Sequence, residues 1–70
     1  MNADVFRATI EYYKTLRHTT NEKLRLRTTI TRTMFYKYMK NPELMPIGAF
    51  EQIMDSLNVP KTERFKSFED

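Results

Sequence analysis

The sequence predicts an all-α protein of four to five short helices that form a single domain over residues 1–70. Apolar residues recur at spacings of three and four, and no useful stretch alternates with a period of two. The chain has one glycine and three prolines, and its helix-breaking residues cluster at Asn41-Pro42, Met45-Pro46 and Asn58-Val59-Pro60. These breaks divide the chain into segments of helical length, so we expect packed helices and no sheet.

The first predicted helix runs from about Ala3 or Asp4 to Arg17, and Asn2 or Asp4 can cap its N-terminus. An amphipathic helix turns its apolar stripe toward the core. The stripe expected here consists of Val5, Ala8 or Thr9, Tyr12 and Leu16, and it is widened by Phe6, Ile10 and Tyr13.

The second predicted helix runs from Asn21 to about Thr28, with Thr20 as its N-cap. Leu24 and Leu26 are expected to supply its apolar contacts. The helix is short and ends in three β-branched residues, 28–30, which favour leaving a helix. The third helix is expected to begin after the cap residue Thr31.

The third helix should end at about Lys40, because the residue before Pro42 avoids the helical region. The fourth has Pro46 near its first turn, and Asn58 can take the left-handed conformation that ends it. Its apolar residues at three-four spacing are Ile47, Phe50, Ile53 or Met54, and Leu57.

A last short helix is expected over residues 61–68, with Phe65 and Phe68 on one side. Two placements of these aromatic residues are open from the sequence. They either pack on the first helix as the final part of the core or bury in a dimer interface.

Basic residues gather in the middle of the chain, although the net charge is only +3. Residues 14–40 carry a net charge of +7, with Glu22 as the single acidic residue, whereas residues 1–13 and 41–70 carry −1 and −3. Such a distribution is typical of a phosphate-binding surface, and a solvated basic surface is the alternative interpretation. The basic residues are Lys14, Arg17, Lys23, Arg25, Arg27, Arg32, Lys37 and Lys40.

The third helix divides into two chemically distinct faces. Phe35, Tyr38 and Met39, together with Ile30 from the turn, form the expected core side. Arg32, Tyr36 and Lys40 are spaced by four on the opposite face, and Thr33 and Lys37 flank them. The exposed face therefore offers positive charge, hydrogen-bond donors and one large aromatic residue.

Two helices joined by a short turn form a helix-turn-helix unit, here at about residues 21–40, whose second helix enters the DNA major groove. Arginine bonds guanine bidentately, and threonine and tyrosine can contact base edges or a thymine methyl. The expected base contacts are Arg32, Thr33, Tyr36 and Lys37. The expected contacts to the DNA backbone are Asn21, Lys23, Thr31, Lys40 and Asn41.

From Thr20 to Leu57 the chain resembles the Cro/CI-type, lambda-repressor-like helix-turn-helix regulators, particularly the small ones of bacteriophages and mobile elements. The resemblance rests on Leu24, on Ile30-Thr31, on the run from Arg32 to Pro42, and on the following amphipathic segment. It implies a sequence-specific transcriptional regulator, such as a repressor or an accessory switch protein. It also implies that the chain binds double-stranded DNA as a homodimer, with a partner regulator protein as a further possibility.

Three positions depart from the family pattern. Asn21 stands where the family usually has glutamine, Arg25 where it prefers a small alanine, and Thr29 where it prefers a glycine in the turn. A β-branched residue at positive φ would be strained. We therefore expect a turn that is built differently or is shifted by one residue.

The sequence lacks the residues that several classes of function require. The chain has no cysteine and a single histidine, His18, so disulfides and the usual zinc ligand sets are excluded. It also has no paired catalytic carboxylates, no His/Cys/Asp set and no glycine-rich phosphate loop, so we expect no enzyme, metal or cofactor. Without a long apolar run or a signal-peptide pattern, a soluble cytoplasmic protein is expected.

Two alternative functions come from other classes. An excisionase-like recombination accessory factor would carry a β wing after the recognition helix, where residues 42–60 predict a helix instead. A protein-interaction module could keep the helical fold while binding another regulator or a host protein. The methionines and the acidic C-terminal half leave room for this second alternative.

Overall fold

The computed structural model describes residues 1–69, and this part of the chain is all-α as the sequence predicts. It contains five α-helices and two 3-10 helices, and no strand. A helix and a 3-10 helix therefore occupy the segment where an excisionase-like factor would carry a β wing. The elements are α1 (Ala3–Leu16), α2 (Asn21–Leu26), α3 (Arg32–Lys40), η1 (Pro42–Leu44), α4 (Ile47–Ser56), α5 (Lys61–Arg64) and η2 (Lys66–Phe68).

The N-caps of α1, α2 and α3 are side chains that the sequence predicts. Asn2, Thr20 and Thr31 each accept a hydrogen bond from the backbone N–H three residues later, at 3.1, 3.2 and 3.3 Å. Each bond satisfies one of the N–H groups that a helix start leaves unpaired. After α4, Asn58 has a φ of 55°, the left-handed conformation expected for it.

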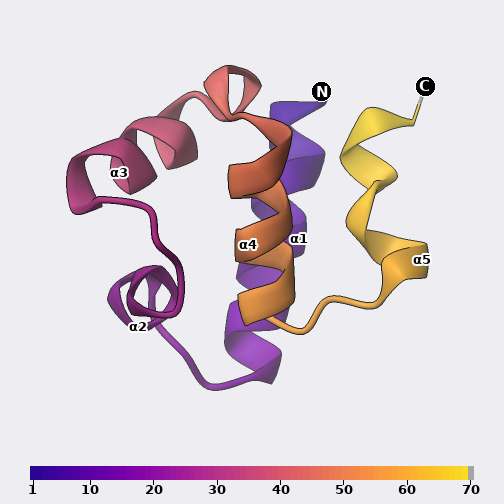
Figure 1. Ribbon diagram of the computed structural model, residues 1–70. Helices are drawn as coiled ribbons and strands as arrows, with labels where there is room; N and C mark the ends of the chain where they lie inside the picture. The colour runs from indigo at the N-terminus through magenta and orange to yellow at the C-terminus, as the bar shows by residue number, and fades with distance from the viewer. Residues whose placement is uncertain (70) are drawn as a thin grey trace.

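Helices α1 and α4 lie side by side and run in the same direction (Figure 1). Near their N-termini, the rings of Phe6 and Phe50 lie 6.1 Å apart between centroids. At their C-terminal ends, Arg17 Nε donates a hydrogen bond to the carbonyl oxygen of Leu57 at 3.2 Å. In Figure 1, α2 and α3 lie on one side of this pair, and α5 with η2 lies on the other.

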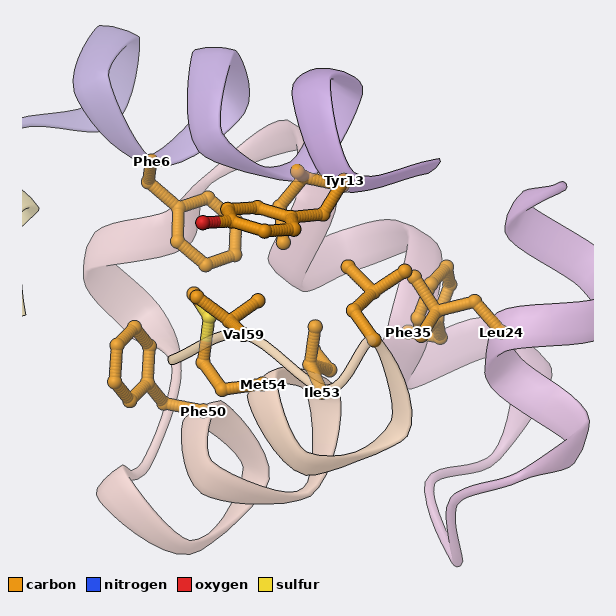
Figure 2. Close-up of a cluster of buried hydrophobic side chains, with 10 residues drawn as sticks. Phe6, Tyr13, Leu24, Phe35, Phe50, Ile53, Met54 and Val59 are labelled. Carbon is orange, nitrogen blue, oxygen red and sulfur yellow. The ribbon is translucent and has the colours of Figure 1, made fainter. Parts of the chain in front are cut away.

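One hydrophobic core joins α1, α2, α3, α4 and the segment that follows α4. Figure 2 shows the α1 side chains Phe6 and Tyr13 facing α4, with Leu24 and Phe35 at the end of the core formed by α2 and α3. The buried hydrophobic residues are Phe6, Ile10, Tyr13, Leu24, Phe35, Phe50, Ile53, Met54, Leu57 and Val59.

The core face of α1 differs from the predicted central stripe. Phe6, Ile10 and Tyr13 are buried, whereas Tyr12 and Leu16 are 62% and 50% exposed. The residues predicted to widen the stripe therefore form the core face, and the prediction is wrong for Tyr12 and Leu16. The physical reason is that α1 carries two adjacent apolar stripes with the same helical spacing, and only one of them can face α4.

Two other residues predicted to face the core are exposed. Leu26 is 67% exposed and Ile47 is 58% exposed. Helix α2 stops at Leu26, two residues earlier than predicted, and the Thr28 hydroxyl donates a hydrogen bond to the Arg25 carbonyl oxygen at 2.8 Å. Because α2 is so short, Leu24 is the one residue that it buries.

Phe65 and Phe68 pack on α4. Their ring centroids lie 5.6 and 5.2 Å from that of Phe50, and the two side chains stay 42% and 46% exposed. One face of this aromatic pair therefore extends the core, while the other faces outward. The backbone N–H of Asn2 donates to the Ser67 carbonyl oxygen at 2.6 Å, which joins η2 to the start of α1.

The helices of residues 1–69 are all too short or too polar to span a bilayer.

Candidate nucleic-acid interface

The turn between α2 and α3 contains no left-handed residue. Among residues 1–69, only His18 and Asn58 have a positive φ, and both lie outside this turn. Thr29 therefore avoids the strain that a β-branched residue would have at positive φ. The sequence left two alternatives open, a turn built differently from the Cro/CI pattern and a turn shifted by one residue. The structure has the first, because no residue of this turn has a positive φ.

Side-chain hydrogen bonds hold this turn in place. The Thr28 hydroxyl accepts a bond from the Ile30 backbone N–H at 3.2 Å. The backbone N–H and the hydroxyl of Thr29 both donate to Oε1 of Gln52 on α4, at 2.8 and 3.0 Å. The turn is thus attached to the core helix α4, and this attachment positions the N-terminus of α3.

Helix α3 has the two faces that the sequence predicts. Phe35 is fully buried, and Ile30 and Met39 pack against the core. Tyr38 is half-buried. The opposite face is exposed and consists of Arg32, Thr33, Tyr36, Lys37 and Lys40.

Glu22 of α2 contacts two side chains on this exposed face. Its Oε2 accepts a hydrogen bond from the Tyr36 hydroxyl at 3.0 Å and lies 3.9 Å from Nε of Arg32. Its Oε1 accepts two bonds from Arg25, from Nε at 2.9 Å and from Nη2 at 2.8 Å. One predicted base-contacting residue, Tyr36, is therefore hydrogen-bonded to a carboxylate on the preceding helix, and a second, Arg32, lies at ion-pair distance from it.

These contacts shift two acid–base equilibria. The hydrogen bonds from Arg25 and then from Tyr36 lower the pKa of Glu22, because they stabilise its charged form. The bond that Tyr36 donates to Glu22 is the main cause of the raised pKa of Tyr36, because ionisation of the phenol would break it. Glu22 is therefore charged and Tyr36 is a neutral donor near neutral pH.

The residues predicted to contact the DNA backbone divide into two groups. Lys23 lies on α2 and Lys40 is the last residue of α3, and both are exposed. Asn21 is half-buried and its Oδ1 accepts a bond from Lys14 Nζ at 2.8 Å. The Thr31 hydroxyl is occupied as the α3 cap, and Asn41 is half-buried after the end of α3.

Several arginines of the basic segment bind the protein itself. Arg17 donates to the carbonyl oxygens of Leu57 and Asn58 at 3.2 and 3.0 Å, and Arg27 donates to that of Ser56 at 3.3 Å. These carbonyls lie at the negative end of α4, which favours a cation. Part of the positive charge in residues 14–40 therefore stabilises the fold, and the outward charge on α2 and α3 is Lys23, Arg32, Lys37 and Lys40.

Three residues that position this surface are missed by the sequence reasoning: Arg7, Glu22 and Gln52. Arg7 donates to the Lys40 carbonyl oxygen at 2.7 Å and so holds the end of α3 against α1. Its partner lies 33 residues away, and Gln52 lies 23 residues from Thr29. No local pattern could reveal these pairs, whereas Glu22 is visible in the sequence as the single acidic residue of the basic segment and as an acidic residue at the positive N-terminal end of the second helix.

Comparison with protein-family models, with curated proteins and with solved structures finds no match for this chain. Its class therefore rests on its own fold and surface. It is a small all-α protein in which one short helix turns a basic, hydrogen-bonding face outward.

Proposed function

We propose that the chain is a sequence-specific DNA-binding transcriptional regulator of the Cro/CI type, of phage or mobile-element origin. In this proposal α3 enters the major groove of double-stranded DNA. The observation that carries it is the exposed face of α3, backed by the fully buried Phe35. A helix that is anchored on one side and carries donors on the other suits groove reading.

Each exposed residue has a role that its chemistry supports. Arg32 can bond O6 and N7 of guanine, Thr33 can meet a thymine methyl, and Tyr36 and Lys37 can reach other base edges. Lys23 and Lys40 suit phosphate contacts, which fix the register of a protein on DNA without reading sequence. Asn21, Thr31 and Asn41 are proposed as further contacts to the DNA backbone.

We also propose that the protein binds as a homodimer, because a single recognition helix reads only one half-site. The exposed apolar stripe of α1, which includes Tyr12 and Leu16, supports a self-association surface. Regulation would follow from occupancy of the site or from contact with polymerase or a partner regulator.

The test is selection of bound sequences from a random DNA pool, followed by titration of the winning site. We expect one enriched motif, and we expect Arg32→Ala to lose most of its preference for this motif over unrelated DNA. Lys61→Ala, which removes an exposed charge on α5, is the control and should keep the preference. An unchanged preference in Arg32→Ala would show that the reading surface lies elsewhere.

The second candidate is a protein-interaction module that binds another regulator or a host protein. The exposed fractions of Leu26, Tyr12 and Leu16, all 50% or more, favour it. A pool from which no sequence is enriched would support this function over DNA reading.

A further inference from the structure

The Glu22 carboxylate lies between α2 and α3, and its two oxygens have different partners. Oε1 receives both hydrogen bonds from Arg25, at 2.9 and 2.8 Å. The Arg25 side chain is only 20% exposed, so it packs against the domain and keeps Oε1 of Glu22 in place. Oε2 is left to face α3, where Tyr36 and Arg32 approach it.

The contact with Arg32 leaves one edge of its guanidinium open. Nε faces Glu22 at 3.9 Å, and the side chain is 75% exposed. Within residues 1–69, the two terminal nitrogens of Arg32 make no hydrogen bond of their own. The 3.9 Å separation is an ion-pair distance and too long for a hydrogen bond, so Glu22 attracts the guanidinium and leaves the edge formed by its terminal nitrogens free. That edge is the one that can bond O6 and N7 of guanine together.

The hydrogen bond between Tyr36 and Glu22 determines which groups the Tyr36 hydroxyl can bind. A phenol has one proton, and in Tyr36 this proton is donated to Glu22 at 3.0 Å. The oxygen can then only accept a hydrogen bond from a ligand. The ring is held edge-on against Phe35, with centroids 5.3 Å apart and planes at 83°. In the major groove the donors are the amino groups of adenine and cytosine, whereas guanine and thymine offer only acceptors at their edges.

From this geometry we propose that Glu22 sets the base preference of α3. It makes Tyr36 a hydrogen-bond acceptor for a base with an exocyclic amino group, and its charge draws Arg32 to the neighbouring position, where the free edge of the guanidinium can bond a guanine. The inference rests on the proposed function and deepens it by naming the base chemistry that is read. It also explains Arg25, which stands where the Cro/CI pattern prefers a small residue and here supports the Glu22 carboxylate.

The test compares motifs selected from one random DNA pool by the wild type, Arg32→Ala, Glu22→Gln and Tyr36→Phe. In the wild-type motif we expect a guanine whose preference is lost in Arg32→Ala. We also expect an adenine or a cytosine whose preference is lost in Tyr36→Phe and kept in Arg32→Ala. Glu22→Gln removes the charge and should weaken both preferences by at least about fivefold. It should not weaken binding to unrelated DNA, because it removes a negative charge.

The matched control is Glu63→Gln, which removes another carboxylate that pairs with a basic residue three positions later. Glu63 contacts Lys66 at 2.5 Å and belongs to α5, which lies across the α1 and α4 pair from α3 (Figure 1), so its variant should select the wild-type motif. Thermal melts establish that each variant is folded, and Tyr36→Phe carries the test alone if Glu22→Gln does not fold.

The outcomes separate the two proposals. A clear wild-type motif that is unchanged in Tyr36→Phe, or unchanged in a folded Glu22→Gln, overturns the role of Glu22 and leaves DNA reading standing. A wild-type motif without guanine at the Arg32-dependent position does the same. A wild-type pool with no enriched sequence overturns the proposed function, and this inference with it.

Discussion

Gln52 accepts two hydrogen bonds from Thr29, one from the backbone N–H at 2.8 Å and one from the hydroxyl at 3.0 Å. Thr29 lies in the turn between α2 and α3, and Gln52 lies on α4, whose opposite face is buried in the core. This pair therefore connects the packing of α4 to the position at which α3 begins.

Removal of the Gln52 side chain should loosen this turn. We expect Gln52→Ala to lower the free energy of unfolding by about 1 kcal/mol and to speed hydrogen exchange at the Thr29 amide. Gln52→Glu keeps an acceptor oxygen and should retain the slow exchange. Equally slow exchange of the Thr29 amide in Gln52→Ala would show that this bond does not hold the turn.

Truncation of Phe35 should destabilise the whole domain. Its side chain is fully buried, so we expect Phe35→Ala to cost about 3–5 kcal/mol, which would leave so small a domain largely unfolded. Leu26, 67% exposed on α2, is the control, and Leu26→Ala should change stability by less than about 0.5 kcal/mol. Circular dichroism melts measure both, and a Phe35→Ala melt close to the wild type would contradict the core described above.

We expect Lys40 to contact DNA and Arg17 to stabilise the fold, and alanine variants of the two should therefore differ. Lys40→Ala should weaken binding to all DNA and reduce the slope of log K against log salt by about 0.9, with little change in melting temperature. Arg17→Ala should lower stability by about 1 kcal/mol, because it frees the Leu57 and Asn58 carbonyls, and should keep the salt slope. Salt titrations with unrelated DNA distinguish them, and an equal loss of slope in both variants would refute this division.

The exposed stripe of α1 should carry self-association. Tyr12 is 62% exposed, so Tyr12→Glu should leave the fold intact. We expect it to abolish dimer formation on a two-fold DNA site while half-site binding persists, as measured by sedimentation velocity. Thr62→Glu adds the same charge on α5 and should still dimerise. Normal dimers of Tyr12→Glu would place the interface elsewhere.

Acid should destabilise the wild type more than Glu22→Gln. The pKa of Glu22 is lowered in the folded state, chiefly by the hydrogen bonds from Arg25 and then from Tyr36. Such a group contributes stability that is present above its unfolded pKa and is lost as the pH falls through its folded pKa. Denaturant unfolding at about pH 6 and about pH 3 measures this loss. Equal acid losses in both proteins would mean that the Glu22 contacts do not stabilise the fold.

The sequence by itself determined the features that depend on neighbouring residues. Asn2, Thr20 and Thr31 cap the helices because a side chain and a backbone N–H three residues apart meet in any helix start. Asn58 takes its left-handed conformation for an equally local reason. The two faces of α3 follow from helical spacing, so the proposed reading residues are exposed as predicted.

Only the tertiary structure decided the features that depend on distant residues. It buried Ile10 and exposed Tyr12, because α4 packs against one side of the wide apolar surface that the sequence predicts for α1. It assigned Arg17 to the end of α4, although charge counting places that residue with the DNA-facing lysines. It also gave Thr29 its partner Gln52 and so removed the need for glycine in the turn, since contacts between residues far apart in the chain leave no local pattern.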